Sequence, residues 1–470
     1  MSAANVSSSS PGPASGEAAP RPPGSPSRAV GFRRELGLFD AVVVVAGGII
    51  GVGIFANPSN VARVLDHPVA ILLAWGVGGL VALLGGFVWA ELASRFPHVG
   101  GQYVYLARAY HPVVGFLYGV ALLFIINGGS LAAVSILFAS YVDRSFFALG
   151  PTGIRAAAAL ALVTLTAVNA VGVRAGTWTN NVLMTAKVAG MVALVALAFG
   201  SGPTPASDVT MPALAVDGHA VHLLFTALVP ILFAYGGWQN CASIAGEIKE
   251  PARNLPRANV LGVIVVVTLY LSLNLAYLWV LTPAEIAASP ALAADVARAV
   301  AGQAGARFVA LLIVLSSLGF IAVVILTGPR LCYAMAADGL FFERAARLHP
   351  KYQTPVFALW FQTAVSLALL TTNTYDQLLS YVVFADWLFF GLTAGALLIV
   401  RRRTPPTADV ARTPGHPVTT LIFIAVAAGI VVNSFIAYTV QSLIGSAILL
   451  IATIVFFTIN RGTRPTHARS

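Results

Sequence analysis

The sequence contains few charged residues and almost no cysteine. Only 9% of its 470 residues are charged, whereas a soluble domain carries roughly 25%. Its two cysteines, Cys241 and Cys332, supply no disulfide framework. Hydrophobic residues make up 58% of the chain, and they gather in runs of about 20 residues, the length of a membrane-spanning helix. The sequence therefore predicts an all-α integral membrane protein and not a membrane barrel, whose strands are shorter.

Several patterns that would indicate other classes of protein are missing. No GxxxxGKS or GxxxxGKT nucleotide loop occurs, which argues against a primary pump. No predicted span holds the paired titratable groups that an intramembrane enzyme needs, and the eight histidines lie in loops or near span ends. The net charge of +10 comes from residues at span ends, as membrane topology would place them. We therefore expect no enzyme, no cofactor, no metal and no nucleic-acid partner.

The apolar runs predict about twelve membrane-spanning helices. A span needs about 20 apolar residues to cross a hydrocarbon core of about 30 Å. We expect the spans near residues 38–65, 69–95, 113–141, 155–172, 181–200, 222–243, 258–281, 306–331, 354–372, 376–400, 417–437 and 440–460. They form one transporter domain over residues 35–460, with spans 1–5 at about 38–200, spans 6–10 at about 222–400 and spans 11–12 at about 417–460.

Positive charges predict the orientation of these spans. With the N-terminus inside, 21 of the 27 lysines and arginines fall on the cytoplasmic side and five fall outside, while Lys187 lies within a span. Such a bias places both termini in the cytoplasm and the chain in the cell membrane as a multi-pass protein. Residues 1–34 are rich in Ser, Pro, Gly and Ala, with no apolar stretch before Leu36. We expect residues 1–34 to be a disordered cytoplasmic tail without a cleavable signal peptide, and residues 461–470 to be a second cytoplasmic tail.

Two glycine-bearing stretches interrupt spans 1 and 6. The first runs from Gly47 to Phe55 and holds four glycines, and the second runs from Phe233 to Trp238 with Pro230 just before it. Hydrocarbon offers no replacement partner for backbone hydrogen bonds, so such breaks belong around something polar. The two spans enter the membrane from opposite sides, which is the arrangement of an inverted repeat whose paired breaks form a binding site.

The two breaks offer complementary chemistry for a zwitterion. Amide N–H groups at the start of the outer half-helix of span 1 bind an anion such as a carboxylate. Unwound carbonyls of span 6 accept hydrogen bonds from an ammonium group, and Phe233, Tyr235 and Trp238 are expected to wall the site. The alternative is that these glycines allow close helix packing, for which small residues are common in membranes.

Three polar residues within spans are further candidates. Lys187 lies about 9 Å deep at 1.5 Å per residue, so it either snorkels to the surface or serves the transport mechanism. Asp386 lies about 15 Å deep in span 10, where a carboxylate marks a functional site or bonds between helices. Asn127 in span 3 either lines the cavity or joins helices.

The residues around the breaks resemble a known family. Leu38–Phe55, Ala90–Tyr103 and especially Phe233–Ala258 are similar to the amino acid–polyamine–organocation permeases, most closely their L-type amino acid transporter branch. The resemblance implies a LeuT-like, five-plus-five inverted-repeat fold with helices 1 and 6 broken and two further C-terminal helices. It covers roughly residues 35–460 and is strongest over the first seven spans.

The resemblance also implies roles for individual residues. The substrate carboxylate would meet the amides of Gly51, Val52 and Gly53, although relatives commonly have Ser at the position of Val52. Phe233 resembles the family's gating aromatic, and Lys187 resembles a fixed substitute for the sodium ion of cation-coupled relatives. The substrate's ammonium would meet backbone carbonyls of Ile49, Ile50, Phe233, Ala234 and Gly236.

These observations together predict a sodium-independent secondary transporter. We expect it to move amino acids, chiefly neutral ones, by alternating access, either as an exchanger or as a proton symporter. The alternatives are a permease for cationic amino acids or polyamines, and an amino acid sensor that binds without transporting. The loop at residues 141–155 lacks the cysteine through which animal members of this branch join a heavy chain, so we expect no disulfide-linked partner.

Overall fold

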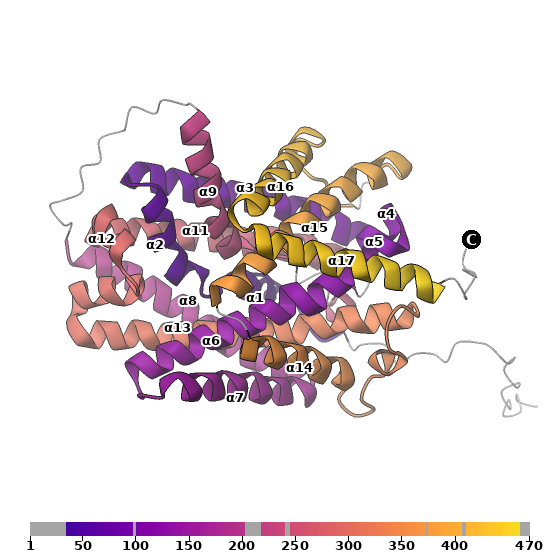
Figure 1. Cartoon of the computed structure of the whole chain (residues 1–470), viewed down its shortest axis with the longest axis horizontal. Coiled ribbons are helices and arrows are strands. Elements are labelled where there is room, and N and C mark those ends of the chain that lie inside the picture. The colour runs from indigo at the N-terminus through magenta and orange to yellow at the C-terminus, as the bar shows by residue number, and fades with distance from the viewer. Residues whose placement is uncertain are drawn as a thin grey trace, which may run out of the picture. The chain divides into compact units, whose positions relative to one another are not determined.

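The computed structural model describes residues 34–96, 100–202, 218–239, 245–372, 375–406 and 410–460. The expected tails, residues 1–33 and 461–470, lie outside these ranges, as does Cys241. Within them the chain is helical, with a single isolated bridge between Leu36 and Ile248. The helices, labelled in Figure 1, are α1 (Leu38–Ile49), α2 (Gly53–Val64), α3 (Pro68–Arg95), α4 (Gln102–Ala109), α5 (Pro112–Ala121), the π-helical turn η1 (Leu122–Asn127), α6 (Gly128–Ser145), α7 (Gly150–Ala170), α8 (Val173–Gly200), α9 (Gly218–Tyr235), η2 (Ala245–Glu247), α11 (Pro251–Val280), α12 (Pro283–Ala288), α13 (Leu292–Ala337), η3 (Glu343–Ala346), α14 (Val356–Thr372), α15 (Tyr375–Arg403), α16 (Val418–Ala437) and α17 (Thr439–Asn460).

The helices confirm the prediction of an all-α membrane protein with about twelve spans. Ten helical segments in the described part of the chain are long and apolar enough to cross a membrane, and Val221–Tyr235 and Val356–Thr371 are shorter apolar helices at the two remaining expected positions. α13 exceeds its predicted span because its bounds include a second, shorter helix before a kink at Ala301 and Gly302, where the backbone is not helical. The membrane-spanning part of α13 follows that kink.

Both predicted breaks are present. α1 ends at Ile49 and α2 begins at Gly53, so a three-residue gap divides one span into two half-helices. α9 ends at Tyr235, and Gly237 then adopts a φ of +120°, a conformation that only glycine accepts readily. Each break follows a run of apolar residues that would otherwise cross the membrane without interruption.

Helix packing shows the expected two-fold relation between spans 1–5 and spans 6–10. Spans 1–5 are α1–α2, α3, α5–α6, α7 and α8, and spans 6–10 are α9, α11, α13, α14 and α15. The contact of α1 with α11 corresponds to that of α9 with α3. In the same way, the contact of α8 with α13 corresponds to that of α15 with α6, and the contact of α6 with α7 corresponds to that of α13 with α14. Exchanging the two sets of five spans thus reproduces these contacts, as an inverted repeat requires. α16 and α17 pack on α15, outside the repeat.

Small residues allow α3 to pack closely against its neighbours. A side chain at Gly78 would meet Ile231 at 2.3 Å, and one at Gly79 would meet Val267 at 2.8 Å. Close approach of helix backbones through small residues is the usual way that membrane helices associate, because lipid supplies no hydrophobic drive between them. α3 therefore lies directly against α9 and α11, which bring the second break toward the first.

A buried ionic cluster joins α3, α15 and the segment after α15. Glu91 has no exposed surface and accepts hydrogen bonds from Arg95 at 2.9 Å and from Arg401 at 2.5 Å. The backbone N–H of Thr413 donates to the same carboxylate at 2.7 Å. The i,i+4 pair of Glu91 with Arg95 was readable from the sequence, whereas the bonds across to Arg401 and Thr413 were not.

A second buried ion pair links α13 to the segment that follows the second break. Arg330 Nε donates to Glu247 Oε1 at 2.8 Å, and both side chains are 1% exposed. The backbone carbonyl of Glu247 also accepts from the N–H groups of Glu35 and Leu36, each at 3.0 Å. The residues just before α1, the segment after α9 and the end of α13 are thereby fixed to one another.

Candidate functional site

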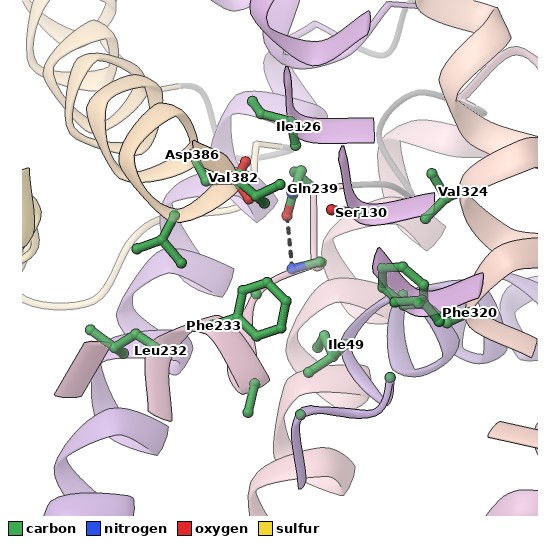
Figure 2. A pocket seen from close by; sticks show the side chains of 18 of the residues that line it. Ile49, Ile126, Ser130, Leu232, Phe233, Gln239, Phe320, Val324, Val382 and Asp386 are labelled. Atoms are coloured by element: carbon green, nitrogen blue, oxygen red, sulfur yellow. Dashed lines mark hydrogen bonds between the residues drawn. The ribbon is translucent and has the colours of Figure 1, made fainter. Parts of the chain in front are cut away.

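One cavity lies between the two breaks. Residues of both breaks, η1, α6, α13 and α15 line it, and Figure 2 shows labelled side chains such as Phe233, Phe320 and Gln239 around it. The space open to the centres of water molecules is about 50 Å³, which is room for a few waters. The lining residues are Gly48, Ile49, Gly51, Val52, Gly53, Ile126, Asn127, Ser130, Val134, Leu232, Phe233, Ala234, Gly236, Gly237, Gln239, Phe320, Val324, Val382, Val383, Asp386, Trp387 and Phe390.

The two breaks touch through their backbones. A Cβ atom added to Gly237 would lie 2.2 Å from the carbonyl oxygen of Gly48, and one added to Gly53 would lie 2.9 Å from Cα of Ala234. Any larger side chain at these positions would separate the breaks. The glycines thus bring the polar backbone of span 1 against that of span 6.

The start of α2 presents unused backbone donors. The N–H of Gly51 donates within the break, to Ile49 O at 2.8 Å. The N–H groups of Val52, Gly53 and Ile54 make no hydrogen bond to any described residue. Val52 and Gly53 line the cavity, so these N–H groups form a helix N-terminus that favours an anion.

Side-chain donors hold several carbonyls of the breaks. The hydroxyl of Tyr270, from α11, lies 3.2 Å from Ile49 O and 3.3 Å from Ala234 O, so it bridges the two breaks. Ser316, from α13, donates to Gly51 O at 3.0 Å. Neither Tyr270 nor Ser316 was predicted from the sequence, because each is one polar group among many on apolar helices.

The ammonium of Lys187 reaches the first break. Lys187 lies in α8 and its side chain has no exposed surface, so it does not snorkel to the membrane surface. Its Nζ atom donates to the carbonyl oxygen of Ile50, and it would lie 3.6 Å from a Cβ atom built on Gly319. The structure therefore places the amine of Lys187 directly behind the unwound backbone of span 1.

Some residues predicted for the site lie beside the cavity instead of lining it. Ile50 offers its carbonyl to Lys187, and its side chain is buried. The ring of Tyr235 packs against Trp75 and Tyr270, with centroids 5.6 and 5.1 Å away. The ring of Trp238 packs 6.1 Å from Trp89 and 5.1 Å from Phe390. Of the three predicted aromatic walls, only Phe233 lines the cavity.

The polar candidates of spans 3 and 10 both line the cavity. Asn127 ends the π-helical turn η1, and π-helical turns occur often at functional sites. Asp386 enters from α15. Sequence reasoning missed Ser130, Gln239 and Phe320, although Gln239 follows the second break directly and is a polar residue in an apolar stretch.

The arrangement suits binding of a small zwitterion and holds no group placed for bond breaking. Free N–H groups at Val52 and Gly53 stand on one side, and carbonyls of the second break stand on the other. The N–H of Gly236 donates to Phe233 O at 3.2 Å, which leaves that carbonyl one further lone pair. The cavity therefore offers separate places for a carboxylate and an ammonium group.

Comparison with known proteins identifies the family. The model of the family described as amino acid permease matches residues 36–458. The chain is 30% identical over 376 residues to the b(0,+)-type amino acid transporter 1 of Mus musculus, covering 79% of this chain and 76% of that protein. It is 28% identical over 398 residues to the serine/threonine exchanger SteT of Bacillus subtilis, covering 84% and 90%, and 29% identical over 410 residues to the large neutral amino acids transporter small subunit 2 of Homo sapiens, covering 85% and 76%.

The family model extends over nearly the whole described chain, including both breaks and the cavity. These matches agree with the resemblance drawn from the residues around the breaks, and they indicate transport and not enzyme catalysis. The chain belongs to the amino acid permease family, within the amino acid–polyamine–organocation superfamily, and is a multi-pass membrane transporter.

Proposed function

We propose that this protein is a sodium-independent transporter of neutral amino acids that works by alternating access. One observation carries the proposal: two broken helices present unused N–H groups and carbonyls to a single small cavity. The substrate carboxylate binds the N–H groups of Val52 and Gly53, and the α-ammonium binds carbonyls of Phe233, Ala234 and Gly236. The carbonyl of Ile49 already accepts from Gly51 and Tyr270. Phe233 borders the cavity and acts as its gate.

Lys187 supports sodium independence. Its ammonium group donates a hydrogen bond to the carbonyl oxygen of Ile50. A sodium ion at this place would need that oxygen as a ligand. A fixed cation supplies the same attraction for the break without an ion being carried across the membrane. Transport then proceeds either by exchange or with a proton.

Neutral substrates are favoured over cationic ones by the size of the cavity. The cavity offers about 50 Å³ to the centres of water molecules. A cavity of this size suits a short side chain better than a long cationic one. The names of two relatives, a large neutral amino acids transporter subunit and a serine/threonine exchanger, agree with this choice. Asp386 is the observation that favours the second candidate, a cationic amino acid or polyamine permease, because it is a carboxylate in the cavity wall.

We further propose that the transporter domain spans residues 35–460 in the cell membrane, with both termini in the cytoplasm. The support is the distribution of positive charge, with 21 lysines and arginines on one side and five on the other. Residues 141–155 contain no cysteine, so we propose that the protein works without a disulfide-linked heavy chain.

Uptake into liposomes tests the proposal. Purified protein is reconstituted, and uptake of radiolabelled serine, alanine and leucine is measured in sodium-free and sodium-containing buffer. Vesicles preloaded with unlabelled amino acid are compared with empty ones, with and without an inward proton gradient, and protein-free liposomes are the control. Uptake only into preloaded vesicles identifies an exchanger, and proton-driven uptake into empty vesicles identifies a symporter. Strict dependence on sodium, or binding without uptake, would contradict the proposal, and the second result would identify a sensor.

A further inference from the structure

The cavity has a polar group of side chains that the proposed backbone contacts do not use. Asn127, Ser130, Gln239 and Asp386 line it from four different places in the chain, namely η1, α6, the segment after α9, and α15. Figure 2 shows Ser130, Gln239 and Asp386 directed into the same space. The two breaks are proposed to bind the carboxylate and the ammonium of an amino acid. These polar side chains are therefore available to contact the side chain of the substrate.

Asp386 carries an atom that lacks a hydrogen-bond donor. Its Oδ1 oxygen is buried and has no hydrogen-bond partner among the described residues. A buried oxygen left without a donor costs free energy, and most such oxygens in proteins have a partner. Asp386 also lines the cavity, so a ligand with a hydroxyl group beside it can donate a hydrogen bond to its carboxyl group.

The surroundings of Asp386 restrict what that occupant is. Val382, one turn earlier on α15, together with Ile126 and Val324, gives the cavity apolar walls. Gln239 is fixed in place because its Oε1 atom accepts from the N–H of Gly237 at 3.1 Å. The small volume favours a short side chain over a lysine-like chain of four methylenes.

We propose that Asp386, with Ser130 and Gln239, forms a subsite for the side-chain hydroxyl of a small amino acid such as serine or threonine. The inference rests on the proposed function, because it assumes that the two breaks hold the carboxylate and the ammonium. A hydroxyl both donates and accepts, so it pairs with the carboxyl group of Asp386 whether or not that group carries a proton. A methyl group in the same place leaves the oxygen unpaired.

Threonine and valine provide the sharpest test, because they have nearly the same shape and differ by one hydroxyl. Their inhibition of radiolabelled alanine uptake into proteoliposomes is compared for the wild type, Asp386→Asn, Asp386→Leu and the control Gly76→Ala. A hydrogen bond to a charged group corresponds to a preference of about 10- to 100-fold for threonine over valine in the wild type. Asp386→Asn keeps hydrogen-bonding capacity and retains a preference of about 3- to 10-fold.

Asp386→Leu is expected to lose the preference for threonine. Gly76→Ala keeps the wild-type ratio, because Gly76 does not line the cavity and a Cβ there meets no atom within 4 Å. Uptake of alanine with equal inhibition by threonine and valine in the wild type would overturn this inference and leave the proposed transport intact. Stronger inhibition by ornithine or lysine than by threonine would also overturn it, because Asp386 would then pair with an ammonium group. Absence of any amino acid uptake would overturn the proposed function and this inference with it. The wild-type ratio and Asp386→Asn decide the question even if Asp386→Leu fails to fold.

Discussion

Replacing Gly237 with alanine tests whether the two breaks must touch. The added Cβ would lie 2.2 Å from the carbonyl oxygen of Gly48, and ordinary contact begins at 3.4 Å, so the breaks must separate by about 1.2 Å. The backbone also has a φ of +120°, where a side chain is strained. Overpacking of this kind costs about 1–3 kcal/mol, and a left-handed backbone conformation adds about 1–2 kcal/mol.

The separation also affects binding. Hydrogen bonds require donor–acceptor distances of about 2.7–3.2 Å, so a shift of about 1.2 Å removes those that a substrate makes to the opposite break. Loss of two charge-assisted bonds at about 1.5 kcal/mol each weakens apparent affinity by about 100-fold or more. The assay is the concentration dependence of amino acid uptake by Gly237→Ala proteoliposomes, together with its thermal unfolding in detergent.

Two other glycines supply controls for this experiment. A Cβ at Gly76, in α3, would meet no atom within 4 Å, so Gly76→Ala keeps both uptake and stability. A Cβ at Gly236 would lie 3.5 Å from the nearest atoms, so Gly236→Ala is expected to lose less than about tenfold in affinity. Equal uptake by Gly237→Ala and Gly76→Ala would refute the idea that contact between the breaks builds the site.

Three further predictions concern charged groups. Lys187→Met removes the donor to Ile50 O, and we expect amino acid uptake in sodium-free buffer to fall about tenfold or more; unchanged uptake would argue against a role for this charge. Glu247→Gln leaves Arg330 without its buried carboxylate partner and should lower the free energy of unfolding by about 3–5 kcal/mol, seen as a lower Tm that a second change, Arg330→Met, partly restores. Burial, with a neighbouring arginine, lowers the pKa of His416, so protonation opposes folding and stability should decline as pH falls through about 6.5. Thermal unfolding of His416→Gln should show a weaker decline of Tm with falling pH. A decline identical to that of the wild type would exclude this histidine as its cause.

Much of the fold was predictable because the membrane restricts what an apolar run can form. Runs of about 20 apolar residues have to be helices, and the helices found agree with the expected spans from Leu38 to Asn460. The break between Ile49 and Gly53 was readable because its glycines interrupt an apolar run, and hydrocarbon offers no partners for unpaired backbone groups. The short helix of α13 before Ala301 and Gly302 was not predicted. Its residues form too short a run to cross the membrane, so the pattern of apolar spans does not reveal it.

The cavity was only partly predictable, because composition indicates which residues are near a break but not which way they face. Phe233, Tyr235 and Trp238 look equivalent in sequence, yet only Phe233 lines the cavity, while the other two rings pack into aromatic clusters. Tyr270 was missed because its hydroxyl meets both breaks from a span that shows no irregularity in its own sequence. Contacts between distant spans depend on helix rotation, which an apolar run alone does not determine.

The contact between Gly237 and Gly48 has a consequence for how such a site changes over time. Its proposed recognition groups are peptide N–H and C=O units, which every residue possesses, so most codon changes nearby leave them chemically identical. Selection then has to preserve the backbone conformation of the breaks, which depends on a few glycine positions where a Cβ atom does not fit. Substrate range can then change through substitution of wall residues such as Asp386. The backbone groups that bind the carboxylate and ammonium shared by all amino acids remain unchanged.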